Sequence, residues 1–499
     1  MLNNIINYFE KTVAKNYNKV AIVDESSSLT FGELKDKAKK IASSIFGSLN
    51  GEKHKNIALF IDRSCDLTAA MMGAVYSGNV YTVLDTHSPK DRLDKILDVL
   101  SPSAVIVSKD TKDNFCQNFE SKNVICIDDC VEAKNSANLD DIISTDPLYI
   151  LFTSGSTGVP KGTVLSHGNV ISYIEWFIDT FRINNKTVFG SQTPLYFSMS
   201  VSDFFATIFA GATYVIIPTK YFAFPLKAIQ FMNEQKVNTI YWVPSAISIM
   251  ANIDMFKYQK PEHLKKVLFA GEVMHNKPLN YWRNNLKGVK YYNLFGPTEA
   301  TDICCYYEVN RKFRNDESLP IGIACRNCDC MIVSDGKRVT AQDEMGELYI
   351  RGSFLAHGYY KNDAKNKENF VQNPIQSDYP EVVYKTGDLV KYNKYGEMEF
   401  CGRADYQIKH MGYRIELGEI ENTIVAIEKV QDAVCLFDDK NDEIVLIYTG
   451  RIKVDELMAT LNKKLVYYMM PAKVYKEQLL PYNANGKVDR KALKNTYIK

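Results

Sequence analysis

A loop of small hydroxyl and glycine residues that ends in a lysine is the segment of this sequence best suited to chemistry. Residues 151–162 read LFTSGSTGVPKG and follow a strand-like apolar run from Leu148 to Phe152. Glycines let a backbone approach a polyphosphate and turn N–H groups toward it, while hydroxyl groups and an ammonium add donors and positive charge. The pattern therefore predicts a phosphate-binding loop made by Thr153, Ser154, Gly155, Ser156, Thr157, Gly158 and Lys161.

The spacing excludes two other functional loops. A Walker A loop has Ser or Thr directly after a Gly-Lys pair, but Lys161 follows Pro160 and precedes Gly162. A nucleophile elbow needs Gly-x-Ser-x-Gly, which the segment lacks. A flexible Ser/Gly linker is the structural alternative, and the ordered-looking sequence on both sides of the loop argues against it.

The elements that must position this loop follow a βαβ rhythm. Up to about residue 250, short apolar runs alternate with amphipathic runs, which predicts doubly wound α/β layers. The first strands are expected at Ala21–Asp24, Asn56–Ile61, Tyr81–Asp85 and Ala104–Ser108. The helices between them are expected at Phe31–Phe46, at Leu67–Tyr76 and after Ser88-Pro89, where a hydroxyl cap precedes a first-turn proline.

After residue 319 the alternation of strand-like and helical runs gives way to short strand-like runs. From about Leu319 to Phe400, short strand-like runs are separated by Gly, Asp and Asn turns, which predicts a β-rich subdomain. These runs are Cys330–Val333, Gly346–Ile350 and Glu397–Cys401. The last hundred residues are expected to form a small α+β unit.

Composition excludes several classes of protein. The 499 residues are 46% hydrophobic and 24% charged, an ordinary globular composition, and the net charge of +1 gives no reason to expect nucleic acid or an anionic membrane as the main partner. Glu10 and Lys11 interrupt the apolar core that a signal peptide would need. No apolar run reaches the length of about 18 residues that a membrane-spanning helix requires. We therefore expect a cytoplasmic protein.

Eleven cysteines without a secretion signal indicate free thiols in a reducing compartment. Cys325, Cys328 and Cys330 are close enough in sequence to suggest a metal site, but a zinc site usually needs a fourth ligand. Cys304 and Cys305 are adjacent, which is poor geometry for two ligands of one ion. Small buried apolar side chains are the preferred interpretation of this group.

The loop at residues 149–162 resembles the signature loop of the adenylate-forming (ANL) superfamily, which includes acyl-CoA ligases, luciferases and the adenylation domains of nonribosomal peptide synthesis. The resemblance extends over nearly the whole chain, and ten motifs in family order carry it. Overall it is strongest to stand-alone amino acid adenylation enzymes of the D-alanine–carrier protein ligase type. Besides the loop, the motifs lie at residues 29–34, 77–85, 194–203, 293–301, 346–359, 384–388, 402–409, 412–420 and 485–490.

The resemblance implies an ATP-dependent ligase that joins a carboxylic acid to AMP and then passes the acyl group to a thiol. Adenylation brings a carboxylate to the α-phosphorus of ATP, so two anions must be held together by cations and aligned donors. ATP and Mg²⁺ are therefore the expected cofactors. A degenerate, regulatory or scaffolding homologue is the non-enzymatic alternative, and it is disfavoured because the residues of the motifs are retained.

The resemblance assigns roles to the residues of the nucleotide motifs. Glu299, beside Thr298, would help to hold Mg²⁺, and Phe295 would stack near the adenine. Asp388 would accept hydrogen bonds from both ribose hydroxyls, and Arg403 would reach the ribose or a phosphate. A surface acid and a turn residue are the alternatives for Glu299 and Asp388. The expected nucleotide site also includes Asn293 and Gly296.

The C-terminal motifs imply a moving domain. Lys487 matches the catalytic lysine that contacts the substrate carboxylate and the α-phosphate during adenylation, and a point charge on a flexible stem suits a residue that must arrive and leave. Asp405 matches the hinge about which the small domain rotates for thioester formation. Gly412 matches the glycine that lines the pantetheine tunnel. We therefore expect a large domain, residues 1–403, and a small mobile domain, residues 404–499.

The acyl pocket departs from the pattern of α-amino acid activators. In those enzymes an aspartate after the aromatic residue of the fourth motif pairs with the α-ammonium, but here Phe197 is followed by Ser198. An ammonium buried without a counter-charge would cost several kcal/mol. The other expected pocket positions are Met199, Ser202, Tyr241, Leu268, Ala270, Gly271, Leu294, Asp302 and Ile303.

Asp302 is the unusual pocket residue, because apolar residues are common at this position in the family. Either the amine of a β- or ω-amino acid meets Asp302, or the substrate has no amine and Asp302 holds a hydroxyl or points away. We favour an amino-type substrate. Asp203 is a less favoured ligand, because acids at its position in the family usually face elsewhere.

The thiol acceptor has two alternatives. The chain stops nine residues after Arg490, so we expect a separate carrier protein to supply a phosphopantetheine thiol. Free coenzyme A is the alternative acceptor. The sequence makes no prediction of oligomeric state.

Overall fold

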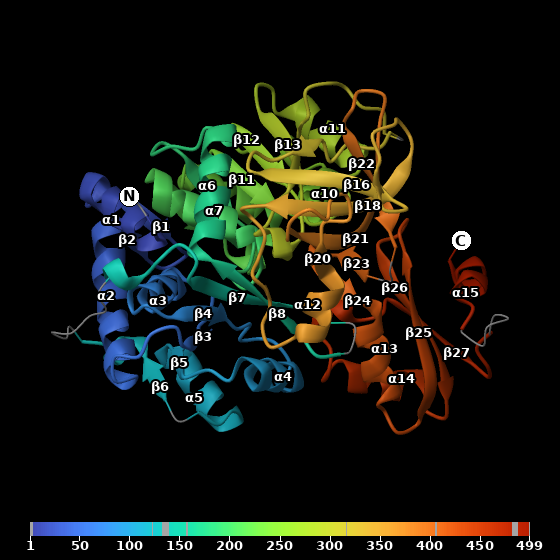
Figure 1. Cartoon of the computed structure of the whole chain (residues 1–499), viewed down its shortest axis with the longest axis horizontal. Coiled ribbons are helices and arrows are strands. Elements are labelled where there is room, and N and C mark those ends of the chain that lie inside the picture. The colour runs from blue at the N-terminus through green and yellow to red at the C-terminus, as the bar shows by residue number, and fades with distance from the viewer. Residues whose placement is uncertain are drawn as a thin grey trace. The chain divides into compact units, whose positions relative to one another are not determined.

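Along the chain, strands and helices alternate up to β13 (Lys290–Phe295), and strands predominate in the segment that follows (Figure 1). The described residues of this computed structural model are 3–121, 123–131, 139–155, 158–315, 317–404, 407–481 and 488–498. They belong to two units: residues 1–86, 100–151 and 162–404 form the first, and residues 87–99, 152–161 and 405–499 form the second.

Polar caps in the sequence fix where the helices of the first unit begin. Thr30 and Glu33 form a capping box at the start of α2, and Ser64 caps α3. Both helices therefore begin within two residues of the predicted positions. The helices of this unit are α1 (Ile5–Asn16), α2 (Phe31–Ser48), α3 (Cys65–Tyr76), α5 (Lys109–Asn118), α6 (His167–Phe181), α7 (Met199–Ala210), α8 (Thr219–Phe222), α9 (Pro225–Glu234), α10 (Pro244–Asn252), α11 (Asn276–Asn285) and α12 (Asp363–Asn369).

Two sheets with parallel centres confirm the predicted α/β class. Among the described residues, one sheet has the order β19-β8-β7-β4-β3-β5-β6, with parallel pairing from β7 through β6. Its central strands are fully buried apolar runs, as expected for strands covered on both faces. Its strands are β3 (Asn56–Phe60), β4 (Val80–Val83), β5 (Ala104–Val107), β6 (Val124–Cys126), β7 (Pro147–Thr153), β8 (Lys161–Ser166) and β19 (Gly358–Tyr359).

The second sheet extends the alternation well beyond residue 250. Within the described chain its order is β15-β14-β13-β12-β11-β9-β10-β1-β2, and pairing is parallel from β13 to β1. The carboxyl ends of its parallel strands therefore meet at one edge. Its strands are β1 (Val20–Val23), β2 (Ser28–Thr30), β9 (Val188–Ser191), β10 (Thr213–Ile216), β11 (Thr239–Trp242), β12 (Lys266–Phe269), β13 (Lys290–Phe295), β14 (Cys305–Glu308) and β15 (Ile323–Ala324).

The segment after residue 319 forms an antiparallel sheet, as the turn-rich sequence predicts. The order is β17-β16-β18-β21-β20, and β22 pairs with β21. This sheet has its own apolar core, which includes Ile332, Leu348 and Ile350. Its strands are β16 (Cys328–Ser334), β17 (Lys337–Arg338), β18 (Met345–Gly352), β20 (Phe370–Gln372), β21 (Val382–Tyr392) and β22 (Met398–Arg403).

The second unit is a small α+β structure. A hairpin of β23 (Gln407–His410) and β24 (Tyr413–Glu416) turns through Met411 and Gly412, both at positive φ, the pattern of a tight hairpin turn. A separate sheet, β25-β26-β27, shares an apolar cluster with the helices of this unit. The other elements are α4 (Lys90–Leu100), α13 (Leu417–Val425), β25 (Val430–Asp438), β26 (Glu443–Gly450), α14 (Val454–Leu461), β27 (Lys473–Glu477) and α15 (Arg490–Tyr497).

Short 3₁₀ turns join several of these elements. The one that matters for the site, η4 (Thr298–Ala300), follows β13 directly. The others are η1 (Ile127–Asp129), η2 (Leu139–Asp141), η3 (Met255–Lys257) and η5 (Tyr467–Met469). No helix in the described part of the chain is long and apolar enough to cross a membrane.

Candidate active site

A sharp return of the chain after β13 brings the predicted metal and pocket residues together. A Cβ atom on Gly296 would lie 2.5 Å from both the Asp302 carbonyl oxygen and the Ile303 Cα, so only glycine lets the chain fold back here. Thr301, at a φ of 68°, completes the return. Leu294 and Ile303, two predicted pocket residues, are both buried on either side of this turn.

Glu299 is a buried acid at the centre of the return. Its side chain is fully buried, and the Tyr359 hydroxyl donates to Glu299 Oε1. The backbone N–H of Ala356 donates to the Glu299 carbonyl at 2.9 Å. Thr298, next to it, is also buried. The surface-acid interpretation of Glu299 is therefore wrong, and the carboxylate and hydroxyl oxygens present form a donor set that suits a hard divalent cation.

Asp388 and Arg403 come from two separate motifs, and the strand register brings them together. They are register partners in β21 and β22, and Arg403 Nη1 lies 2.5 Å from Asp388 Oδ1. Arg403 Nη2 also donates to the Thr386 carbonyl at 3.0 Å. Asp388 is 2% exposed, so it lies within an ordered strand rather than in a solvated turn. Asn293 is anchored too, because its amide donates to the Pro320 carbonyl at 2.8 Å.

The phosphate loop lies in the second unit, where its donors meet residues of β24 and α13. The Ser154 hydroxyl donates to the Arg414 carbonyl at 2.6 Å, and the Gly155 N–H donates to Glu419 Oε2 at 3.2 Å. Lys161 lies 4.0 Å from Glu416 and is 8% exposed. The loop donors therefore already bond to anionic or carbonyl oxygens, the same chemistry that a phosphate would offer.

Two further features of the loop suit close approach of a ligand. A Cβ on Gly155 would lie 2.1 Å from the Val159 carbonyl oxygen, and Gly158 has a φ of 79°. The hydroxyl of Thr153 is buried and has no hydrogen-bond partner in the described part of the chain, so it remains available to an acceptor. Four predicted residues, Ser156, Thr157, Asp405 and Lys487, lie outside the described residues.

The predicted acyl-pocket residues converge because they end parallel strands or begin α7. Tyr241 lies in β11, and Leu268 lies in β12 with Ala270 and Gly271 just after it. Ser198, Met199 and Ser202 are buried at the start of α7, and Phe197 before them is partly buried. Ends of adjacent parallel strands are the usual place for a ligand in an α/β sheet.

Asp302 is buried and accepts hydrogen bonds from three hydroxyl groups, which we call the hydroxyl cage. Asp302 Oδ2 accepts from Ser202 at 2.6 Å, from Tyr241 at 3.1 Å and from Tyr173 at 3.2 Å. The Ser198 side chain is a fourth hydrogen-bonding neighbour. Burial nevertheless raises the pKa of Asp302 to about 6. The carboxyl group is therefore held in place by neutral donors, without a cation among these neighbours.

Asp203 is a second buried acid on α7. Its Oδ1 accepts from the Phe204 N–H at 2.9 Å, and Ser191 bonds to it through the side chain. Burial raises the pKa of Asp203 to about 7, and the positive charge of Arg63 opposes this rise. The charge of Asp302 also raises the pKa of Asp203. Two acids with raised pKa values thus lie within electrostatic reach of one another.

Two tyrosine hydroxyl groups complete this site. Tyr173, which no motif marks in the sequence, projects from α6 to Asp302 and also contacts the Ser202 hydroxyl at 2.7 Å. Tyr359, from β19, ends the motif at residues 346–359 and donates to Glu299. The sequence assigns no role to either hydroxyl, so only the tertiary structure shows what it contacts.

The cysteines that lie close together are not the three that the sequence suggested, which were Cys325, Cys328 and Cys330. Among the described residues, the sulfur atoms that lie within 4.8 Å of one another are those of Cys304, Cys305 and Cys330. Cys325 instead directs its thiol to the Ile303 carbonyl at 3.8 Å. Although Cys304 and Cys305 are adjacent in sequence, their thiols lie close to the same point, because Cys304 precedes β14 and Cys305 begins it. The prediction that the group is largely buried is confirmed.

A family comparison decides what kind of enzyme this site belongs to. The model of the family described as AMP-binding enzyme matches residues 9–360. The chain belongs to that family. This AMP-binding enzyme is therefore an adenylate-forming ligase, as the resemblance in the sequence implied.

The curated relatives include large synthases and one protein of similar length. Gramicidin S synthase 1 of Brevibacillus brevis is 29% identical over 97% of this chain, but the match spans only 44% of that protein. Bacitracin synthase 1 of Bacillus licheniformis is 30% identical over 97% of this chain and 9% of its own length. Zwittermicin A synthase ZmaJ of Bacillus cereus is 28% identical, covering 97% of this chain and 93% of that protein. The chain thus spans less than half the length of two of these three relatives.

Solved structures share the fold at low sequence identity. An NRPS protein containing adenylation and PCP domains, bound to a vinylsulfonamide inhibitor, aligns with a TM-score of 0.85 at 20% identity, covering 99% of this chain and 84% of that one. The o-succinylbenzoate CoA synthetase of Bacillus subtilis aligns with a TM-score of 0.84 at 20% identity, covering 98% of both chains. These alignments establish the fold of the AMP-binding enzyme.

Proposed function

We propose that this AMP-binding enzyme adenylates a small amino acid whose amino group lies away from the α-carbon, and transfers it to the phosphopantetheine thiol of a separate carrier protein. The single observation that carries the substrate class is the hydroxyl cage around Asp302. A β- or ω-amino group fits because Ser198 offers no counter-charge at the position where an α-ammonium would lie.

Electrostatics favours an ammonium over a neutral group at Asp302. The acid is buried among hydroxyl donors, so its ionised form is disfavoured until a cation reaches it. A substrate ammonium would offset this cost, whereas a hydroxyl group would add a further neutral donor to a carboxyl group whose Oδ2 already accepts three.

The nucleotide half supports ATP as the co-substrate. We assign the phosphates to Thr153, Ser154, Gly155 and Lys161, the adenine to Phe295, and the ribose hydroxyls to Asp388 with Arg403. Glu299 and Thr298 would hold Mg²⁺, which would supply positive charge to the phosphate oxygens. Lys487 is the proposed catalytic lysine, because it matches the family position.

The acceptor assignment rests on the relatives. Several curated relatives are synthases, among them those of gramicidin S and bacitracin, and one structural neighbour is an NRPS protein with a PCP domain, which favours a carrier protein. A CoA synthetase shares the fold almost equally well, so free coenzyme A stays as the alternative acceptor. Mass spectrometry of a phosphopantetheinylated carrier protein and of free coenzyme A, offered together, separates the two by the site of acylation.

An ATP–pyrophosphate exchange screen tests the substrate class. It should contain α-, β- and ω-amino acids and their amine-free counterparts, with wild type, Asp302→Asn, and Ser198→Asp combined with Asp302→Asn. We expect exchange with a β- or ω-amino acid, a KM at least about 100-fold higher in Asp302→Asn, and some α-amino acid exchange when the charge is moved to position 198. Exchange only with amine-free acids, unchanged in Asp302→Asn, would overturn the proposal.

A further inference from the structure

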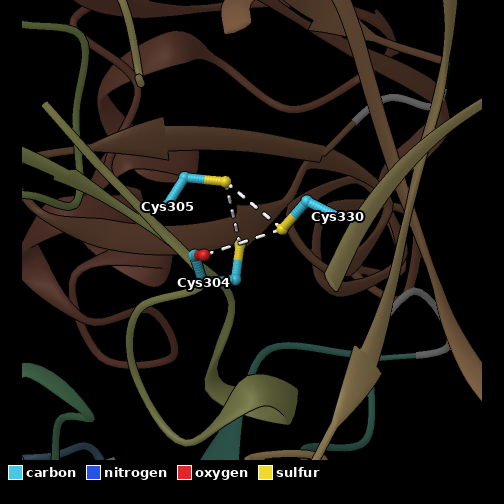
Figure 2. Close-up of side chains that lie close together, drawn as sticks. All are labelled: Cys304, Cys305 and Cys330. Carbon is cyan, nitrogen blue, oxygen red and sulfur yellow. Dashed lines mark hydrogen bonds between the residues drawn. The ribbon is translucent and has the colours of Figure 1, made fainter. Parts of the chain in front are cut away.

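Three buried thiols converge on one point that the proposed reaction does not use. The Sγ atoms of Cys304 and Cys305 are 3.8 Å apart, and those of Cys305 and Cys330 are 3.3 Å apart. All three lie within 4.8 Å of one another. Figure 2 shows the three sulfur atoms facing each other from the start of β14 and from β16, and we call them the thiol triad.

The surroundings of the thiol triad are apolar. Its neighbours in the core include Phe295, Ile321 and Ile332. Burial and the neighbouring Cys304 raise the pKa of Cys305 well above its ordinary value, and hydrogen bonds with the neighbouring thiols, together with burial, raise the pKa of Cys330, so these two thiols stay protonated. A ligand that left net negative charge at this place would bear a large desolvation cost.

The net charge of the occupied site distinguishes between thiophilic ions. Zn²⁺ held by three thiolates would carry one net negative charge, and a structural zinc site takes four ligands rather than three. Cu⁺ held by two or three thiolates would be anionic as well. A trivalent metalloid held by three thiolates is neutral and needs three ligands, which is what the triad provides.

We propose that the thiol triad binds one arsenic(III) atom, delivered as arsenite, in the form of a neutral tris-thiolate. The step is As(OH)₃ + 3 RSH → As(SR)₃ + 3 H₂O. Three As–O bonds break, three As–S bonds form, and the thiol protons leave in water, so no oxidant or reductant is required. Because the triad is buried, binding proceeds through local opening of this region and is slow.

Binding would disturb the neighbouring turn. The Cys304 thiol donates to the Phe295 carbonyl at 3.4 Å, and Cys304 follows the pocket residues Asp302 and Ile303. Loss of that bond is expected to slow adenylation. This consequence rests on the proposed function, whereas binding itself does not, so a failure of one is distinguishable from a failure of the other.

Native mass spectrometry of the reduced protein with sodium arsenite tests the proposal. We expect a slowly formed adduct whose mass gain equals one arsenic atom less three hydrogens. It should be lost in Cys330→Ala and retained in Cys401→Ser and Cys126→Ala. X-ray absorption at the arsenic edge should give three sulfur ligands in the wild type.

Three results would overturn the proposal. They are no adduct in folded wild type, an adduct that persists in Cys330→Ala, and a mass gain of one AsOH group less two hydrogens, which would mean capture by two thiols only. If Cys330→Ala fails to fold by circular dichroism, Cys305→Ala is the second variant.

Discussion

At the residue scale, Asp302 combines a proposed binding role with a cost in stability. It is fully buried, and its pKa is raised from 3.8 to about 6 in the folded state. A folded pKa above the unfolded value means that the folded protein binds more protons between about pH 4 and pH 6, so the free energy of unfolding falls as pH rises through this window. Above pH 6 the ionised group costs roughly 3 kcal/mol.

Replacing this acid should therefore stabilise the substrate-free enzyme. Asp302→Asn keeps an acceptor oxygen for the cage and removes the charge, so we expect an equal or higher free energy of unfolding than wild type at pH 8, by up to about 3 kcal/mol. The advantage should shrink as pH falls toward 5. Urea unfolding at several pH values measures it. A variant that is markedly less stable at pH 8 would show that the ionised carboxylate contributes to folding.

The same group sets a pH dependence for substrate binding. An ammonium pairs with the ionised carboxylate, and below pH 6 protonation of Asp302 competes with it. The KM for the amino acid should rise about tenfold for each pH unit below 6, while the KM for ATP changes little. Initial-rate measurements of exchange between pH 5 and 8 test this. A KM for the amino acid that is flat across that range would contradict the assignment.

The cage residue Tyr173 acts through Asp302 rather than on substrate. Tyr173→Phe removes a hydroxyl that donates to Asp302, so it should raise the pKa of Asp302 further. The pH profile of the KM for the amino acid should then shift to higher pH, with a smaller effect on kcat. Ser202→Ala should shift the profile in the same direction, because its hydroxyl is the shortest donor to the same oxygen. A uniform loss of activity at all pH values would mean a purely structural role.

At the element scale, the return after β13 is what converts a strand end into a site. A Cβ on Gly296 would meet the backbone of Asp302 and Ile303, and the return holds both Glu299 and Asp302 within one short buried segment. The parallel order of β9, β11, β12 and β13 supplies the edge on which the pocket residues gather. A local backbone requirement and a sheet topology thus jointly place the chemistry.

A single added methyl group should break this arrangement. Gly296→Ala requires the Asp302–Ile303 backbone to shift, so we expect exchange activity to fall at least about 100-fold while the rest of the fold remains. Gly47→Ala, in α2 with open space around it, is the matched control and should keep full activity. Exchange assays with circular dichroism separate the two effects. Wild-type activity in Gly296→Ala would mean that the turn tolerates a side chain.

At the scale of the whole molecule, the residues proposed to act in adenylation are divided between the two units. The phosphate loop belongs to the second unit, whereas Glu299, Asp388 and Asp302 belong to the first. The proposed boundary at residues 403 and 404, with its hinge at Asp405, stays a prediction. An enzyme whose catalytic lysine lies on a moving domain should need that lysine in one half-reaction only.

Lys487→Ala tests whether the lysine acts in adenylation only. We expect ATP–pyrophosphate exchange to fall at least about 100-fold, because a cation at the reacting phosphate is lost. Thioester formation from supplied acyl adenylate should remain within about threefold of wild type. Quenched-flow assays of each half-reaction measure the two rates. Equal loss in both would place Lys487 outside the proposed role.

The order of the first strands and helices, the α/β class and the nucleotide motifs could be predicted from the amino acids alone. These features are local: helix caps such as Thr30, apolar periodicity and short glycine-rich loops act over a few residues, so they can be read without knowing the fold. The family followed from the same motifs, and the family comparison confirms it. Ser198 and Asp302 also identify the acyl pocket as unusual from the sequence alone.

The side chains that surround those residues could be identified only in the folded chain. Tyr173 reaches Asp302 across 129 positions, and Tyr359 reaches Glu299 across 60. The sequence could not indicate that Cys304 and Cys305 would share a point with Cys330 rather than with Cys325. Such contacts depend on strand order, register and helix packing, which are set by the burial of the whole chain and not by any one segment. Local chemistry can therefore be predicted from the motifs, whereas its environment depends on packing.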